Sequence, residues 1–247
     1  LGAAAWVVEK VLAEGEGYGR SDRYAGQKAL VEFVSANPTG PLHIGHARGA
    51  VIGDALARIF EATGYEVYRE YYYNDAGVQM ENLGLSLRAR YLQSLGIDAP
   101  FPENGYRGDY LIEIAELLKA ERGDAMKDET DWRPFTLYAT KHTIAWIDDV
   151  LKALRIRFDN YLSETTLHDG GQVKGALERL KANGMMYEKD GAWWLRSTDY
   201  GDEKDRVVIK SDGNYTYLAP DIAYHEYKFE RGFDRLINVL GADHHGY

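Results

Sequence analysis

Two histidines, three residues apart, constrain the fold of this 247-residue chain more than any other feature. Residues 29–35 are mostly apolar, as in a buried strand, and a loop rich in Pro and Gly follows them. His43 and His46 then open a segment whose apolar residues recur at helical spacing. Because the free N–H groups at a helix N-terminus bind anions, this order predicts a site where a polyphosphate contacts both imidazoles.

The strand and helix pattern repeats directly afterwards. Residues 66–73 form an aromatic-rich strand, and Asn74 and Asp75 are suitable N-cap residues for a helix that runs to about residue 94. Strand, helix, strand, helix predicts an α/β fold with a doubly wound parallel sheet and right-handed crossovers. In such sheets ligands bind at the carboxyl ends of the strands, where the histidine loop and Asn74 both fall.

The pattern changes over residues 97–206, for which we expect an α+β insertion within the sheet fold. Helices are expected over residues 110–122, 135–154 and 172–183. Hairpins are expected to pair residues 185–188 with 192–196, around a type I′ turn at Asp190 and Gly191, and residues 207–210 with 215–218, around Asp212 and Gly213. A helix over about residues 221–231 and a buried strand over 236–240 should follow, and residues 3–14 should form a short amphipathic helix.

Composition excludes several classes of protein. The chain has no cysteine, so disulfides and thiolate metal sites are excluded. No apolar run approaches the ~20 residues that span a bilayer, and the N-terminus lacks a signal-peptide pattern, so we expect a cytoplasmic protein with no membrane partner. The net charge of −10 argues against a wholesale basic footprint for nucleic acid. It leaves open a local basic strip, a cationic substrate, or an acidic surface that serves only solubility.

Four blocks of sequence together resemble one family. Residues 41–46 resemble the HIGH signature of class I aminoacyl-tRNA synthetases, and the preceding residues 32–40 are similar to bacterial arginyl-tRNA synthetase. Further blocks of that family are found, in the same order, at residues 71–79, 215–224 and 238–246. The resemblance implies a Rossmann-like catalytic core that activates L-arginine with ATP to arginyl-adenylate and transfers it to tRNA(Arg). The alternatives are a class I synthetase for another amino acid and a non-catalytic relative with the same fold.

The resemblance assigns phosphate chemistry to the HIGH region, which comprises Ala36, Asn37, Pro38, Thr39, Gly40, Pro41, Leu42, His43, Ile44, Gly45 and His46. The arginine carboxylate attacks the α-phosphate of ATP, and the catalytic residues His43 and His46 would stabilise the growing charge by hydrogen bonds. Mg²⁺ is expected with ATP, but no side chain is assigned to a metal. The residues expected to bind ATP are Pro41, Leu42, His43, Gly45, His46, Gly241, Asp243 and His244. Alternatively, the two histidines only cap and pack the loop, or bind zinc, for which no third ligand is evident.

Recognition of arginine requires a carboxylate for the guanidinium and an aromatic wall for its flat face. The resemblance implies that Tyr217 and Asp221 line the pocket for the arginine side chain, and that Ser35 and Asn37 bind its α-amino and carboxylate end. The alternative for Asp221 is an N-cap role in its own helix. For residues 71–73, a substrate role and simple packing of an aromatic strand are equally supported.

The sequence departs from the family at its end. A loop resembling Lys-Met-Ser-Lys-Ser should follow the last strand and is not found there. We therefore expect a catalytic core that is cut at both ends, monomeric, and inactive or nearly so by itself. Its expected parts are the tail of an N-terminal domain with a linker (1–26), the first half of the catalytic domain (27–96), the insertion (97–206) and the second half of the catalytic domain (207–247).

Overall fold

The computed structural model describes residues 2–241, and a four-stranded parallel sheet organises the fold of this part of the chain. The strands are β1 (Lys28–Glu32), β2 (Glu66–Tyr73), β3 (Asn160–Ser163) and β7 (Arg235–Asn238). Their order in the sheet is β3-β2-β1-β7, so the chain moves outward on one side of β1 and then returns to its other side. The predicted doubly wound parallel sheet is confirmed. Its switch point lies between β1 and β7, where this type of sheet opens a crevice at the carboxyl ends of the strands.

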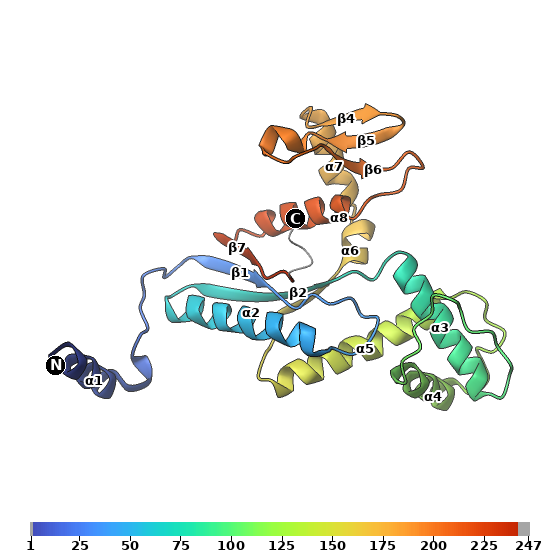
Figure 1. Cartoon of the computed structure of the whole chain (residues 1–247), viewed down its shortest axis with the longest axis horizontal. Coiled ribbons are helices and arrows are strands. Elements are labelled where there is room, and N and C mark those ends of the chain that lie inside the picture. The colour runs from blue at the N-terminus through green and yellow to red at the C-terminus, as the bar shows by residue number, and fades with distance from the viewer. Residues whose placement is uncertain (1, 242–247) are drawn as a thin grey trace.

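Helices cover both faces of this sheet (Figure 1). The helices α2 (Ile44–Ala62) and α5 (Arg133–Ala153) pack on one face, in a core with Val31, Phe33 and Tyr71. On the other face α8 (Leu218–Glu230) packs with Tyr72 and Leu162. Successive strand residues point to opposite faces, so the adjacent Tyr71 and Tyr72 belong to different cores.

A third core lies beyond the end of the sheet. It joins α3 (Val78–Ser94) and α4 (Tyr110–Arg122) to the first half of α5. Its fully buried members include Leu83, Leu87, Tyr91, Leu111, Ile114 and Phe135. The long helix α5 thereby connects this helical lobe to the sheet (Figure 1).

A small antiparallel sheet packs on the outer side of α8. It contains β4 (Met186–Lys189), β5 (Ala192–Leu195) and β6 (Arg206–Ile209), with η2 (Ser197–Tyr200) between the last two strands. The helices α6 (Glu164–Asp169) and α7 (Gln172–Ala182) complete this core. Asp190 and Gly191 have φ angles of 53° and 74°, which confirms the predicted type I′ turn.

The structure corrects three predicted elements. The strand predicted over residues 29–35 ends at Glu32, because Val34 and Ser35 adopt left-handed φ angles of 66° and 44°. The second hairpin is confirmed only in part: the chain reverses at Gly213 and Tyr215 forms an isolated antiparallel bridge with Ile209, but no strand runs to residue 218, where α8 begins. Helix α3 begins at Val78 with Gly77 as its N-cap, and neither Asn74 nor Asp75 caps it.

The strand β3 and the helix α6 were not predicted. Strand β3 has only four residues, too few to show a period, and it pairs with β2, which lies far back in the sequence. It lies within residues 97–206, and it extends the main sheet. Helix α6 follows it directly and has only six residues.

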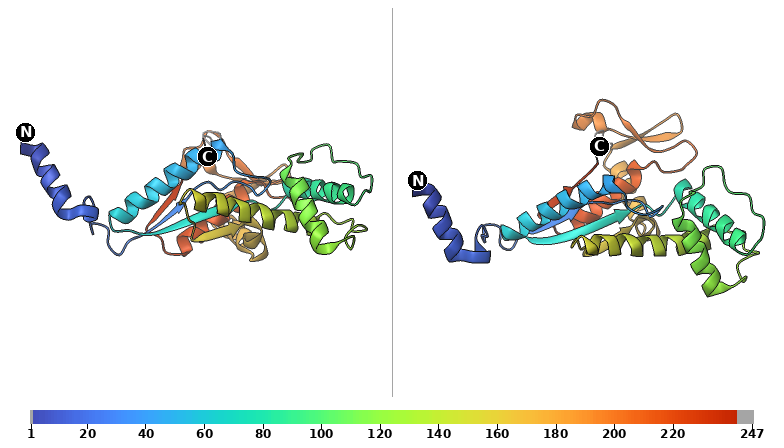
Figure 2. Two further views of the ribbon diagram at one scale, coloured as in Figure 1. Left: turned by 90° about the horizontal axis from the view of Figure 1, so that it is seen from below. Right: turned by 60° about the horizontal axis from the view of Figure 1, so that its bottom comes forward.

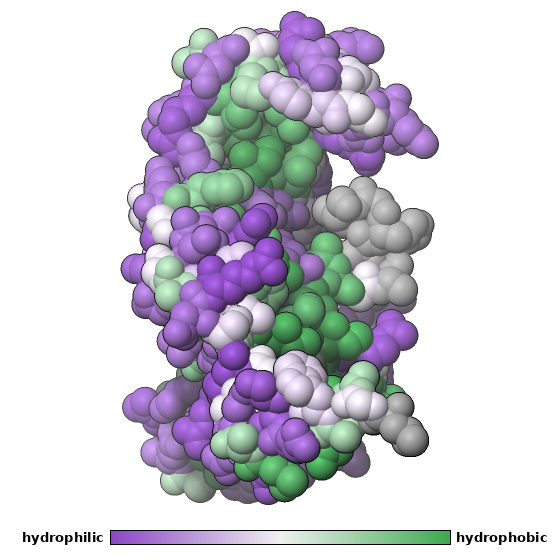
Figure 3. Space-filling model, turned by 90° about the vertical axis from the view of Figure 1, so that its left-hand side faces the viewer, coloured by the Kyte–Doolittle hydropathy of each residue, from purple (hydrophilic) through white to green (hydrophobic). Residues whose placement is uncertain are grey.

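The first helix projects away from the sheet (Figure 2). Helix α1 (Gly2–Glu14), which confirms a prediction, is followed by η1 (Gly15–Gly17), and neither contains a buried residue. Large apolar side chains of α1 are exposed, Trp6 and Leu12 among them, and Figure 3 shows apolar residues among hydrophilic ones on this side of the molecule. No helix in residues 2–241 combines the length and the apolarity that crossing a membrane requires.

Candidate active site at the carboxyl edge of the parallel sheet

The two histidines form a reciprocal cap at the start of α2. Nδ1 of His43 accepts a hydrogen bond from the backbone N–H of Gly45, and Nδ1 of His46 accepts one from the backbone N–H of His43, both at 3.1 Å. The rings stack with their centroids 3.8 Å apart. Because each Nδ1 accepts a hydrogen bond, a neutral ring carries its proton on Nε2. The cap therefore turns both side chains into Nε2–H donors.

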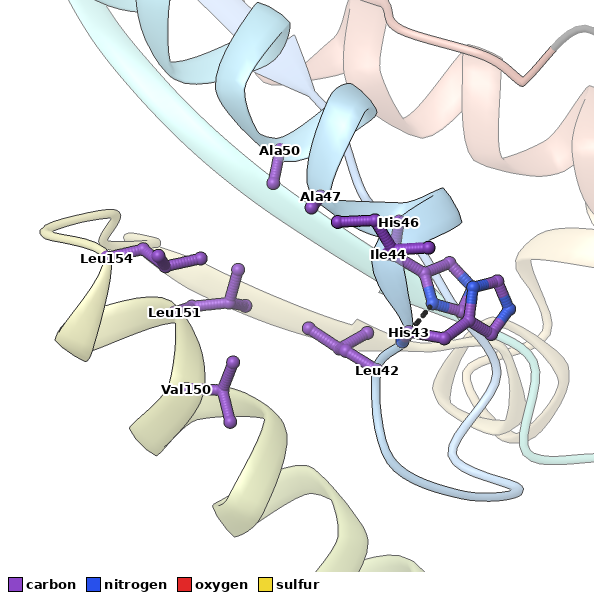
Figure 4. Close-up of a pocket in the computed structure, with 9 residues that line it drawn as sticks. All are labelled: Leu42, His43, Ile44, His46, Ala47, Ala50, Val150, Leu151 and Leu154. Atoms are coloured by element: carbon purple, nitrogen blue, oxygen red, sulfur yellow. Dashed lines mark hydrogen bonds between the residues drawn. The ribbon is translucent and has the colours of Figure 1, made fainter.

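The two rings lie at one end of an apolar pocket between α2 and α5. His43 and His46 line this pocket together with Val150 and Leu151, and Figure 4 shows their rings at the end away from α5. No hydrogen bond within residues 2–241 engages either Nε2. Burial, followed by the neighbouring His43, lowers the pKa of His46 and so favours its neutral form. The predicted capping role is real, but it leaves the two Nε2 atoms available for a ligand.

The loop before α2 is anchored from two other elements. The hydroxyl of Tyr71 donates to the carbonyl of Ala36 at 2.8 Å, and the hydroxyl of Tyr110 donates to the carbonyl of Thr39. At Gly45 a Cβ atom would lie 2.8 Å from the ring of His43. Glycine at this position therefore makes room for the capping imidazole, which explains why the sequence has glycine between the two histidines.

The strained end of β1 directs Ser35 and Asn37 to the carboxyl edge of the sheet. A left-handed φ is rare for a β-branched residue, and Val34 adopts one immediately before Ser35. Ser35 Oγ donates to Glu32 Oε1 at 3.1 Å and accepts the backbone N–H of Tyr72 at 3.2 Å. Asn37 Oδ1 accepts the backbone N–H of Asn74 at 3.1 Å. The predicted pair is therefore placed at this edge, and both side chains tie β1 to the end of β2.

Three carboxylates from three different elements influence one another at the same edge. They are Glu32 of β1, Glu164 of α6 and Asp221 of α8, and the first two are only 5% and 6% exposed. Burial raises the pKa of Asp221 to about 6, and the negative charges of Glu164 and Glu32 act in the same direction. Burial also raises the pKa of Glu164. Burial outweighs the positive charges of His225 and Lys228 at Asp221 and of His168 at Glu164, which lower these pKa values.

Only Glu32 has a cation of its own. The fully buried Nζ of Lys228 lies 2.6 Å from Glu32 Oε2 and 3.0 Å from Asn238 Oδ1. In the part of the chain that the structure describes, no Lys or Arg forms an ion pair with Glu164 or Asp221. His168 Nε2 lies 3.7 Å from Glu164 and is charged only when protonated. Glu164 and Asp221, called the acidic pair below, therefore form an electronegative cluster suited to a cationic group.

The two residues predicted for the arginine pocket differ in how far they are exposed. Tyr217 is the N-cap residue of α8, and its side chain is 71% exposed. Asp221 lies one turn further on and is partly buried, with its backbone N–H donating to the carbonyl of Tyr217 at 3.4 Å. The alternative in which Asp221 caps its own helix is wrong, because Tyr217 holds that position.

Glu164 is the site residue that sequence reasoning missed. Asp75 places it: Asp75 Oδ2 accepts Ser163 Oγ at 2.6 Å, and Oδ1 accepts the backbone N–H of Thr165 at 3.0 Å. Asp75 was predicted to cap the helix that follows it, but it binds the start of α6 instead. The sequence signal that could have identified Glu164 is its position as an acidic residue in the first turn of α6, directly after the short strand β3.

Part of the predicted nucleotide site lies beyond the described residues. Gly241 is the last described residue and is exposed, whereas Asp243 and His244 fall outside residues 2–241. The strand leading there is in place, because the backbone N–H of Val239 donates to the carbonyl of Glu32 at 2.9 Å. Among the described residues, no group of three or more His, Asp or Glu side chains is arranged to hold a metal ion.

Comparison with known proteins connects these features to one family. The family model described as the catalytic domain of class I tRNA synthetases (R) matches residues 7–101 and 126–247. The arginine–tRNA ligase of Shouchella clausii is 56% identical over 98% of this chain, and that of Oceanobacillus iheyensis is 52% identical over the same share. The chain spans 44% of the length of each of these curated relatives.

Solved structures agree with this match. A Campylobacter jejuni chain described as an arginyl tRNA synthetase is 41% identical, with a TM-score of 0.87 over 96% of this chain and 52% of its own length. The Thermus thermophilus arginyl-tRNA synthetase is 24% identical, covers 85% of this chain and 37% of its own, and shares the fold with a TM-score of 0.61. With the family model matching most of its length, including the histidine turn and the elements that carry the acidic pair, the chain belongs to the arginine family of class I tRNA synthetases.

Proposed function

We propose that this chain carries the amino-acid-activating part of an arginyl-tRNA synthetase. One observation carries the proposal: the acidic pair, for which no Lys or Arg ion pair is found in residues 2–241, lies at the same sheet edge as the Nε2–H donors of His43 and His46. A cation-binding site beside two phosphate-directed donors matches a substrate with a guanidinium at one end and a reacting carboxylate at the other. The proposed partners are L-arginine, ATP and tRNA(Arg).

In this proposal the acidic pair binds the arginine side chain. A guanidinium presents a planar array of N–H donors that a carboxylate can accept in pairs, which a lysine ammonium cannot match. Asp221 supplies the main countercharge, and the exposed ring of Tyr217 contributes an aromatic surface at the rim. Ser35 and Asn37 hold the α-amino and carboxylate end, which places the arginine carboxylate toward the loop before α2.

The first chemical step joins arginine to ATP. A carboxylate oxygen of arginine forms a bond to the α-phosphorus while the bond from that phosphorus to the bridging oxygen breaks, and pyrophosphate leaves. The Nε2–H groups of His43 and His46 donate to phosphate oxygens as their charge grows, and the N-terminal end of α2 adds its dipole. Backbone groups of residues 41–45 line the same turn, and Mg²⁺ that accompanies ATP would be held mainly by phosphate oxygens and water.

The second step would transfer the arginyl group to tRNA(Arg). A terminal hydroxyl of the tRNA attacks the carbonyl carbon of the adenylate, and AMP leaves. We propose a monomeric, cytoplasmic protein, in keeping with the absence of cysteine. We also propose that the chain alone is weakly active or inactive, because it spans less than half of the relatives' length.

Calorimetry with L-arginine and three other amino acids tests the proposal. L-arginine is expected to bind the chain, whereas L-citrulline, its neutral counterpart of nearly the same shape, and L-lysine should bind far more weakly. Asp221→Asn should remove this preference. Comparable affinity for arginine and citrulline would contradict the assignment, and tighter binding of lysine or glutamate would favour a synthetase for another amino acid.

A second measurement tests the nucleotide half of the site. ATP should bind the chain with a lower affinity after His46→Ala, whereas arginine binding should be retained. Unchanged ATP affinity in this variant would favour the alternative in which the fold has lost its chemistry.

A further inference from the structure

Tyr72 contacts three parts of the candidate site at once. Its backbone N–H donates to Ser35 Oγ at 3.2 Å, and its hydroxyl donates to Glu164 Oε2 at 2.7 Å. Its ring stacks on that of Tyr224, with centroids 4.3 Å apart and an interplanar angle of 13°. Tyr72 lies on β2, which is between β1 and β3 in the sheet, and Ser35 and Glu164 follow the ends of these two strands.

We propose that Tyr72 is the positioning residue that directs the Glu164 carboxylate toward the cationic end of the substrate. This inference rests on the proposed function, and it assigns a role to a side chain that the sequence alone left open between packing and substrate contact.

The geometry leaves one oxygen of Glu164 for a ligand. Asp75 fixes the backbone at the start of α6, so the remaining freedom of Glu164 is rotation of its side chain. The hydroxyl of Tyr72 holds Oε2 and thereby sets that rotation. Among the described residues, none forms a hydrogen bond with Oε1, and His168 Nε2 lies 3.7 Å from it, which is beyond hydrogen-bond distance.

Tyr72 is itself held rigidly, as a positioning residue must be. Its partner in the stack, Tyr224, is 2% exposed and donates its hydroxyl to Glu70 Oε1 at 2.8 Å. Glu70 is fully buried and pairs with Arg231 at 2.7 Å. The ring of Tyr72 is therefore fixed from the sheet on one side and from α8 on the other, and its hydroxyl has little freedom to follow a moving carboxylate.

The charged surroundings of Glu164 make this contact measurable. Asp75 raises its pKa from the loop after β2, and His168 on α6 lowers it. Asp221 on α8 faces Glu164 and carries a like charge. The charged groups near Asp221 are His225, Lys228 and Glu32 of β1. The hydrogen bond from Tyr72 favours the ionised carboxylate and lowers the pKa. Its removal should therefore disorder Glu164 and raise its pKa.

The chain contains a matched control. Tyr161 on β3 donates its hydroxyl to Asp148 Oδ1 at 2.9 Å, which is the same chemistry on the opposite face of the sheet. Asp148 belongs to α5 and is not a member of the acidic pair. Tyr161→Phe therefore reproduces the loss of one tyrosine–carboxylate hydrogen bond without touching Glu164.

The experiment compares Tyr72→Phe, Tyr161→Phe and the unsubstituted 247-residue chain. The titration of Glu164 is followed by NMR with ¹³C-labelled glutamate in ligand-free protein, and the Kd for L-arginine is measured by calorimetry between pH 5 and 8. Tyr72→Phe should raise the pKa of Glu164, weaken arginine binding by about tenfold near neutral pH, and move the acid limb of the binding profile to higher pH. Tyr161→Phe should leave all three unchanged.

The outcomes separate this inference from the function on which it rests. A Glu164 titration and an arginine Kd that are unchanged in Tyr72→Phe would overturn the positioning role. Equal losses in Tyr72→Phe and Tyr161→Phe would also overturn it, because they would reveal a general effect on the sheet. Absence of arginine binding by the unsubstituted chain would instead contradict the proposed function.

Discussion

Arginine binding should weaken sharply in mild acid, because Asp221 must be ionised to meet a guanidinium. Burial, with Glu164 and Glu32 nearby, raises the pKa of Asp221 to about 6. For a cation that binds only the ionised carboxylate, the apparent Kd equals the Kd for the ionised form multiplied by one plus the ratio of protonated to ionised carboxyl. With a pKa of about 6, roughly nine-tenths of this carboxyl is protonated at pH 5, whereas almost none is protonated at pH 7.5.

The expected effect is about a tenfold higher Kd for L-arginine at pH 5 than at pH 7.5. Protonation of Glu164, whose pKa is also raised by burial, should steepen the loss. Asp221→Asn removes the titrating group, so its residual binding should be weak and less dependent on pH. Calorimetry in two buffers of different ionisation enthalpy should also detect proton release when arginine binds near pH 6.

The same pKa shift predicts an opposite effect on stability. Because the pKa of Asp221 is higher in the folded chain than in the unfolded chain, the folded state binds more protons between about pH 4 and 6. The contribution of this group to stability is therefore present in acid and is lost as pH rises through about 6. Asp221→Asn should raise the melting temperature of the ligand-free chain at pH 7.5 while it removes arginine binding. A Kd that does not change between pH 5 and 7.5 in the unsubstituted chain would refute this reasoning.

Three other substitutions give further predictions. Gly45→Ala places a Cβ 2.8 Å from the ring of His43, so ATP affinity should fall about tenfold with little change in melting temperature; equal ATP affinity would contradict the capping role. Lys228→Met leaves the buried Glu32 without its cation and should cost about 3 kcal/mol in urea unfolding, and a cost near zero would show that the pair is dispensable. Gly191→Ala, at a φ of 74°, should cost about 1 kcal/mol and leave the arginine Kd unchanged, which a weakened Kd would contradict.

Local patterns in the sequence were sufficient for most elements of the fold. The aromatic strand 66–73 and the helix 110–122 begin and end where they were predicted, since alternation and helical spacing are visible over such lengths. The type I′ turn was equally predictable, because Asp190 and Gly191 are residue types that tolerate a left-handed φ. Failures occurred where a short segment takes its structure from a distant partner, as in β3, or where backbone strain ends a strand early, as at Val34.

The candidate site was likewise predictable from the sequence only in part. The histidine turn could be predicted because strand, loop and helix follow one another within residues 29–62. The structure adds that both rings accept backbone N–H groups at the start of α2 through Nδ1. Tyr217 and Asp221 were predicted together from the family resemblance, yet one is exposed and the other partly buried, because the direction of α8 relative to the sheet decides which side chain points inward.

By itself the sequence determined the parallel α/β fold, the turn that presents two imidazoles and the family to which the chain belongs. Only the tertiary structure decided that Glu164 faces Asp221, that Asp75 caps a helix 90 residues away and that Tyr72 joins β1 to α6. The physical reason is the distance along the chain over which each effect acts. Periodicity and turn preferences act over a few residues, whereas the acidic pair forms only when strand order brings distant side chains to one edge of a sheet.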